Sequence, residues 1–237
     1  MKSYRLIIFD LDDTLFDYAE TERSAVIEAC KSLGVALAGD LYSKYRIAND
    51  IVRGQYPEIT PDNLQGFRSE RAAEFLALIN RSEVVPEDFV KEYLERSTLG
   101  VLISGVQETL DALDGIPKVV ATNGSNYPRR NKFESSTIAK HFLEFFSAEN
   151  LGVAKPDPAY FLKIIQRFDV PREHVLIVGD DYRVDIEAAI RIGVDCCWFN
   201  YRKEKLDGTL PDSVTVIERF EDLLGLVITG GAHEKKH

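Results

Sequence analysis

Two aspartates follow an apolar run near the start of the chain. The run Leu6 to Phe9 contains no polar residue, and Asp10 and Asp12 come directly after it. Such a run is typical of a strand buried on both faces of a parallel sheet, and these sheets bind ligands at the carboxyl ends of their strands. The two acids would leave the strand on the same side, where their repulsion calls for a cation or for a proton on one of them. Taken alone, Asp-x-Asp-x-Thr also fits an ordinary turn or a helix cap.

A second candidate strand end carries a hydroxyl group and a glycine. The apolar segment Lys118 to Ala121 is followed by Thr122, Asn123 and Gly124, and a helix is expected next. A hydroxyl followed by backbone N–H groups at a helix start can bind an oxyanion or a phosphate. The same residues could instead cap the helix and permit the turn.

A lysine and a further group of acids stand at two more strand ends. Lys155 precedes Pro156, which restricts the lysine to an extended backbone at a corner of the chain. The apolar segment 175–178 runs into Asp180, Asp181 and Asp185. A helix dipole explains acids in the first turn of a helix, which covers Asp181 and can cover Asp185, but it does not explain Asp180. Most of these polar groups, taken alone, fit an ordinary turn or helix cap. Polar groups at four strand ends of one sheet together favour a functional site.

The elements that position these residues form two patterns. Residues 16–100 read as a helical insertion, and the remainder, 1–15 and 101–229, alternates between helix and apolar strand. This alternation predicts an α/β fold with a doubly wound parallel sheet that includes the first strand. The tail 230–237 is glycine-rich and charged, so it is expected to be disordered. Expected helices are 19–33, 41–53, 63–79, 86–95, 106–113, 129–139, 158–168, 183–192 and 220–226, and expected strands after the first are 118–121, 145–147, 175–178, 195–199 and 215–217.

Composition limits the classes of function. The 237 residues are 45% hydrophobic, enough for a sizeable core, and the net charge of −10 disfavours nucleic acid polymers and anionic membranes as partners. No segment has the length of a membrane span and no secretory signal is visible, so we expect a cytoplasmic protein. Cys30, Cys196 and Cys197 form no Cys-x-x-Cys pair.

Four short segments, in order along the chain, resemble the four motifs of the haloacid dehalogenase-like (HAD) hydrolase superfamily. They are Asp10-Leu-Asp12-Asp-Thr, Thr122-Asn123, Lys155-Pro and Gly-Asp180-Asp181 with Asp185. The resemblance implies a Rossmann-like HAD core with a helical cap, and a phosphatase that uses Mg²⁺. It implies that Asp10 is the nucleophile and Asp12 the acid and base. It further implies that Thr122, Asn123 and Lys155 bind the phosphoryl group, and that Asp10, the backbone carbonyl of Asp12 and Asp180 bind the metal.

The same resemblance leaves some roles and the substrate open. Asp185 is expected to orient Lys155 or a metal-bound water, and Asp181 stands where relatives often have Ser or Thr. An acid at Asp12 favours phosphoryl chemistry over dehalogenation. The expected substrate is a small phosphorylated metabolite, with a nucleoside 5′-monophosphate ahead of a sugar phosphate or phosphoglycolate. A β-phosphoglucomutase-like mutase and a noncatalytic phosphoryl-binding switch are the alternatives. Polar cap side chains that could contact substrate, or merely pack the bundle, are Tyr18, Tyr42, Tyr45, Arg46, Arg53 and Tyr56.

Overall fold

The structure is a computed structural model that describes residues 3–37, 39–60, 62–124, 126–206 and 209–228. The chain divides into two compact units, one comprising Met1–Tyr18 with Gly100–His237 and the other Ala19–Leu99. The second unit begins and ends within a few residues of the predicted helical insertion. The tail 230–237, for which disorder is predicted, lies outside the described residues.

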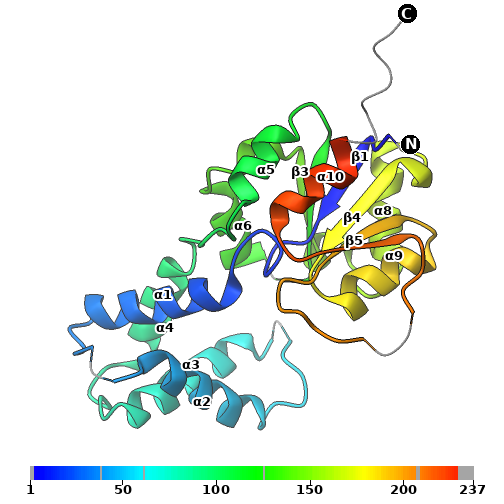
Figure 1. Ribbon diagram of the computed structural model, residues 1–237. Coiled ribbons are helices and arrows are strands. Elements are labelled where there is room, and N and C mark those ends of the chain that lie inside the picture. Colours follow the sequence, from blue (N-terminus) through cyan, green and yellow to red (C-terminus); the bar gives the residue numbers. More distant parts are fainter. Residues whose placement is uncertain (1–2, 38, 61, 125, 207–208, 229–237) are drawn as a thin grey trace, which may run out of the picture. The chain divides into compact units, whose positions relative to one another are not determined.

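The first unit is built on a six-stranded parallel sheet with the strand order β3-β2-β1-β4-β5-β6 (Figure 1). The predicted α/β class with a parallel sheet is confirmed. Strand β1 lies between β2 and β4, which is where the strand order reverses and where such sheets place their ligands. The strands are β1 (Leu6–Phe9), β2 (Lys118–Thr122), β3 (Glu144–Ser147), β4 (Val175–Gly179), β5 (Asp195–Phe199) and β6 (Val214–Ile217).

Helices cover both faces of this sheet, as the apolar run in β1 predicts. All of Leu6–Phe9 is buried, and alternate side chains point into separate apolar clusters, Ile7 and Phe9 into one and Leu6 and Ile8 into the other. The first cluster contains residues of α5 (Val106–Ala112), α6 (Asn126–Glu134) and α10 (Leu223–Ile228), and the second contains residues of α8 (Ala159–Phe168) and α9 (Glu187–Arg191). Shorter segments are η1 (Ala139–His141), α7 (Ala148–Leu151), η2 (Arg172–His174), the π-helix η3 (Tyr182–Ile186) and η4 (Phe220–Asp222).

Three predicted helices differ clearly from the observed ones. The helix expected over 220–226 is divided between η4 and α10, and the differences in the other two have local causes. Helix α6 ends at Glu134 instead of 139, because the hydroxyls of Ser135 and Ser136 donate to the carbonyls of the preceding turn. The predicted helix 183–192 is divided between η3 and α9. The wide turn of η3 carries Asp185, and such turns occur frequently at functional sites.

The second unit contains α1 (Tyr18–Ser32), α2 (Leu41–Arg53), α3 (Leu64–Leu78) and α4 (Pro86–Arg96). Its apolar core includes Tyr45, Phe75, Phe89 and Tyr93, whose rings pack against one another. The Asp40 side chain accepts a hydrogen bond from the Ser43 N–H and so caps α2. Among the helices of the described ranges, none is both long and apolar enough to cross a bilayer.

Candidate active site

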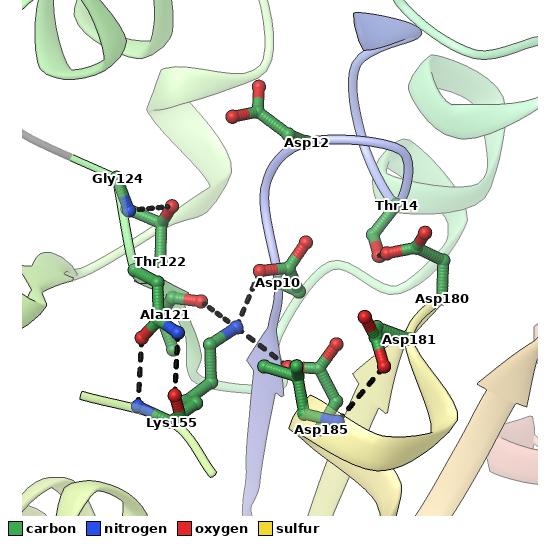
Figure 2. A network of polar contacts seen from close by, with 12 residues as sticks. Asp10, Asp12, Thr14, Ala121, Thr122, Gly124, Lys155, Asp180, Asp181 and Asp185 are labelled. Atoms are coloured by element: carbon green, nitrogen blue, oxygen red, sulfur yellow. Dashed lines mark hydrogen bonds and ion pairs between the residues drawn. The ribbon is translucent and has the colours of Figure 1, made fainter. Parts of the chain in front are cut away.

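The ends of β1, β2 and β4 bring polar side chains to one edge of the sheet. Asp10 follows β1, Thr122 ends β2 and Asp180 follows β4, while Lys155 comes from the loop between α7 and α8. These side chains line a pocket of about 280 Å³ within the first unit (Figure 2). Residues that lie far apart in the sequence thus meet because parallel strands end at the same edge.

Lys155 is the central cation of the pocket. Its Nζ donates to Oδ1 of Asp10 at 2.5 Å, to Oδ1 of Asp185 at 2.6 Å and to the backbone carbonyl of Ala121 at 3.0 Å. The side chain is only 1% exposed. Burial by itself would lower the pKa of Lys155, but Asp10 and Asp185 outweigh burial and raise it. Lys155 is therefore a fixed positive charge at the base of the pocket.

Three carboxylates form an acidic group in the pocket, and two of them, Asp10 and Asp185, contact this lysine. One oxygen from each of Asp10, Asp180 and Asp185 lies within 4.8 Å of the others. Burial is the largest cause that raises the pKa of Asp10 to about 7, with Lys155 opposing it, and burial together with the charge of Asp10 raises the pKa of Asp180 to about 8. A group of hard oxygen donors with crowded negative charge fits Mg²⁺, which prefers oxygen ligands.

The loop after β2 holds the backbone of Lys155. The side-chain amide of Asn123 donates to the Lys155 carbonyl at 2.7 Å, and its oxygen accepts from the Lys155 N–H at 2.8 Å. The Thr122 hydroxyl accepts from the Gly124 N–H at 3.1 Å, which stabilises the turn. Asn123 thus positions the lysine, and phosphate binding by Thr122 and Asn123 stays a prediction.

Asp12 turns its carboxylate away from Asp10 (Figure 2). One oxygen accepts from Nε of Arg129 at 2.5 Å, and the other accepts from Nζ of Lys132. Burial would raise the pKa of Asp12, but these two cations outweigh it and hold the pKa below its usual range. The sequence analysis missed both cations, although a spacing of three places them on one face of α6.

The segment after β4 gives its acids different surroundings. Asp181 is exposed, and its side chain accepts from the N–H groups of Arg183 and Val184, so it caps η3 as the dipole argument expects. Asp185 is instead buried and faces Lys155. A Cβ atom on Gly179 would lie 2.6 Å from the Cβ of Asp185, so the absence of a side chain at position 179 gives Asp185 its room.

Asp13 and Arg202 also line the pocket, and the sequence analysis gave neither of them a role. Asp13 has a φ of 63° and accepts from the Tyr201 hydroxyl at 3.0 Å. Arg202 lies 2.6 Å from Asp13 and 4.0 Å from Asp180. Tyr201 and Arg202 follow β5, and the rule that polar residues after a parallel strand face the ligand edge could have drawn attention to them.

Most of the cap candidates make contacts within their own unit. Tyr45 is 1% exposed and belongs to the core of the bundle. The Tyr42 hydroxyl and the Arg46 guanidinium both contact Glu22, at 3.1 and 3.0 Å. These contacts fit the packing interpretation that the sequence left open. Arg53 donates to the Tyr56 carbonyl at 2.5 Å, and the backbone N–H of Tyr18 donates to Asp13 at 3.2 Å.

Comparison with known proteins adds to this geometry. Residues 4–193 match the family model of haloacid dehalogenase-like hydrolases. The pyrimidine 5′-nucleotidase YjjG of Escherichia coli is 28% identical over 224 residues, covering 92% of this chain and 96% of its own. The phosphoglycolate phosphatase of Pseudomonas fluorescens is 28% identical over 199 residues, covering 83% and 70%. The magnesium-bound crystal structure of the HAD-hydrolase YfnB from Bacillus subtilis has the same fold, with a TM-score of 0.74, 24% identity and coverage of 95% and 99%.

Proposed function

Because this chain belongs to the haloacid dehalogenase-like hydrolase family, we propose that it hydrolyses phosphomonoesters of small metabolites with the help of Mg²⁺. One observation carries the proposal. The Asp10 carboxylate lines the pocket with Lys155 2.5 Å away and lies beside the acids Asp180 and Asp185. A carboxylate held in this way can attack phosphorus, because the neighbouring cations offset the negative charge of the phosphoryl group.

The reaction has two displacements at phosphorus. In the first, an oxygen of Asp10 forms a bond to phosphorus, the bond to the leaving oxygen breaks, and Asp12 gives that oxygen a proton. In the second, Asp12 takes a proton from water, the water oxygen bonds to phosphorus, and Asp10 leaves as a free carboxylate. Lys155 holds phosphoryl oxygens and balances charge in both steps, which is the main source of catalysis in phosphoryl transfer.

The observed state of Asp12 suits the second displacement. Its low pKa and its contacts with Arg129 and Lys132 keep it anionic, which is the form that a base requires. To act as an acid in the first displacement, Asp12 must take up a proton, and its contacts with the two cations must loosen. The acid half of the cycle therefore requires a rearrangement around Asp12.

The carboxylates of Asp10 and Asp180 and the backbone carbonyl of Asp12 would hold Mg²⁺. When bound, this ion polarises a phosphoryl oxygen and neutralises negative charge. Asp185 lies in the same acidic group, but its contact with Lys155 at 2.6 Å gives it the task of orienting that lysine. Asp181 caps η3, and this contact gives it a structural task.

A nucleoside 5′-monophosphate is the proposed substrate class. The pyrimidine 5′-nucleotidase YjjG matches this chain over 96% of its own length, whereas the phosphoglycolate phosphatase of Pseudomonas fluorescens matches it over 70% of its own length. A phosphate-release screen over pyrimidine and purine monophosphates, sugar phosphates and phosphoglycolate tests the choice. A higher kcat/KM for phosphoglycolate or for a sugar phosphate would overturn it.

The nucleophile is tested with Asp10→Asn and the control Asp114→Asn, which changes an exposed loop aspartate. We expect the first variant to release no phosphate from para-nitrophenyl phosphate with Mg²⁺ and to keep the wild-type circular dichroism spectrum. The control should keep full activity. Phosphate release by Asp10→Asn at the wild-type rate would refute the assignment, and a wild-type protein that hydrolyses none of the esters would refute the proposed function itself.

A further inference from the structure

Trp198 is the single tryptophan of the chain. It belongs to β5, where it pairs with Gly179 of the neighbouring strand β4. Gly179 directly precedes Asp180 in the sequence. Trp198 is 3% exposed and packs in the apolar cluster on the α8 and α9 face of the sheet. It therefore lies where a side chain can reach the backbone that carries Asp180.

Two contacts of Trp198 bracket the turn after β4. Its indole N–H donates to the backbone carbonyl of Asp180 at 2.8 Å. Its ring meets the ring of Tyr182 edge-on, with 5.2 Å between the centroids and 65° between the planes. Tyr182 is the first residue of η3, the segment that carries Asp185. One side chain thus holds the start of the turn by a hydrogen bond and its end by packing.

The side chain of Asp180 has weaker support than its backbone. Thr14 donates to Oδ1 of Asp180 at 3.3 Å, and the nearest guanidinium nitrogen of Arg202 is 4.0 Å from Oδ2. The Trp198 hydrogen bond is shorter than both, and it satisfies a carbonyl that follows directly after a buried strand. The direction of the Asp180 carboxylate consequently depends on the backbone that Trp198 fixes.

We propose that Trp198 is a positioning residue for the Mg²⁺ site and that its fluorescence reports metal binding at Asp180. This inference rests on the proposed function, because it requires that Asp180 binds Mg²⁺. Partners that orient metal ligands typically change metal affinity by about 10- to 100-fold when they are removed. Trp198 acts through the ligand, so its loss weakens metal binding, whereas the chemistry of the loaded site continues.

The variant Trp198→Phe keeps an aromatic ring for Tyr182 and loses the N–H donor. Cys197→Ala is the matched control, because Cys197 is buried next to it in β5 but packs in the opposite apolar cluster. Isothermal titration calorimetry of metal-stripped protein with MgCl₂ gives the dissociation constant, and para-nitrophenyl phosphate hydrolysis at rising Mg²⁺ gives the activation constant and kcat.

For Trp198→Phe we expect the Mg²⁺ dissociation constant to rise about tenfold, with kcat at saturating Mg²⁺ within about threefold of wild type. Cys197→Ala should lower the melting temperature and leave the dissociation constant unchanged. An unchanged dissociation constant in Trp198→Phe, or a loss of kcat that added Mg²⁺ does not restore, would overturn the inference. If the wild-type protein binds no Mg²⁺, both the proposed function and the inference about Trp198 fail.

Wild-type fluorescence decides the matter should Trp198→Phe not fold. Titration of the metal-stripped protein with MgCl₂ should change the tryptophan emission with a midpoint equal to the calorimetric dissociation constant. The variant Asp180→Asn should show no saturable change over the same range. Calorimetric Mg²⁺ binding without any change in wild-type emission would contradict the inference.

Discussion

Nζ of Lys155 lies 2.5 Å from Oδ1 of Asp10, and this ion pair is the centre of the site. The Lys155 side chain is 1% exposed and that of Asp10 is 13% exposed, so their charges depend on each other far more than a surface pair would. Asp185 approaches the same nitrogen at 2.6 Å. Removing the lysine would leave two carboxylates close together without a counter-charge.

Lys155→Met should therefore affect both stability and turnover. We expect the free energy of unfolding to fall by about 3–5 kcal/mol, because one partner of a buried ion pair is removed. Turnover should fall by at least about 10²-fold, because the cation that we propose to face the phosphoryl group is lost. Urea denaturation and para-nitrophenyl phosphate hydrolysis measure the two effects. Lys163→Met, which removes an exposed lysine of α8, should change neither by much. A stable and active Lys155→Met variant would be incompatible with this role.

The meeting of Asp10, Thr122 and Asp180 at one edge could be predicted from the sequence, whereas Lys155 reaches this edge from the loop after α7, a helix that the sequence analysis did not predict. Apolar strands alternate with helices along the chain, and parallel strands of one sheet end at the same edge. Each strand end therefore places its polar residues near the others, whatever the details of the loops. The class of fold follows from the same alternation.

The directions of side chains in the loops could not be predicted in this way. Asp12 stands beyond the end of β1, where the alternation of a strand no longer fixes a side, and it faces cations on α6 that lie 117 and 120 residues further on. The contacts of Asn123 with the Lys155 backbone depend on a loop 32 residues away. Such pairings arise from tertiary packing, which periodicity does not describe.

Asp12→Asn should distinguish substrates by their leaving groups. An alkyl phosphate needs a proton on its leaving oxygen, whereas para-nitrophenolate leaves without one. We expect kcat for alkyl phosphates to fall by about 10²–10⁴, and the loss with para-nitrophenyl phosphate to be much smaller in the first displacement. Single-turnover kinetics with both esters measure that step. Equal losses for both esters would show that Asp12 does not supply the proton. Because the variant also removes the anion that faces Lys132, its unfolding must be measured in parallel.

Gly179→Ala should disturb the acid that faces Lys155. The new Cβ would lie 2.6 Å from the Cβ and Cγ of Asp185, so that residue must move. We expect a loss of about 1–3 kcal/mol in the free energy of unfolding, as for other overpacked sites, together with reduced turnover. Gly225→Ala is the control, since a Cβ at this helical position meets nothing within 4 Å and should stabilise α10 slightly. If Gly179→Ala retains wild-type stability and turnover, Asp185 does not need its observed position.

Without metal, stability should fall as pH rises from about 5 to 8. Burial is the main cause of the raised pKa values of Asp10, about 7, and Asp180, about 8, whereas an aspartate of the unfolded chain has a pKa of about 3.9. Between the unfolded and the folded pKa values, the folded state binds more protons than the unfolded chain. The stability that these two acids contribute is therefore fully present below about pH 4 and is lost as the pH rises through 7 and 8. Asp12, with a lowered pKa, contributes with the opposite sign, and only at acid pH.

The measurement is urea denaturation in EDTA at several pH values from 5.5 to 8.5. The slope should be negative, with a limit of about 1.4 kcal/mol per pH unit for each titrating group. Asp180→Asn removes one of the two acids, so its slope should be smaller. If Mg²⁺ binds these carboxylates as we propose, it competes with protons for them, and the stability that it adds should grow with pH. A wild-type stability in EDTA that is constant or rises over this range would contradict the raised pKa values of these two acids, because a folded state that retains their protons loses stability as the pH rises.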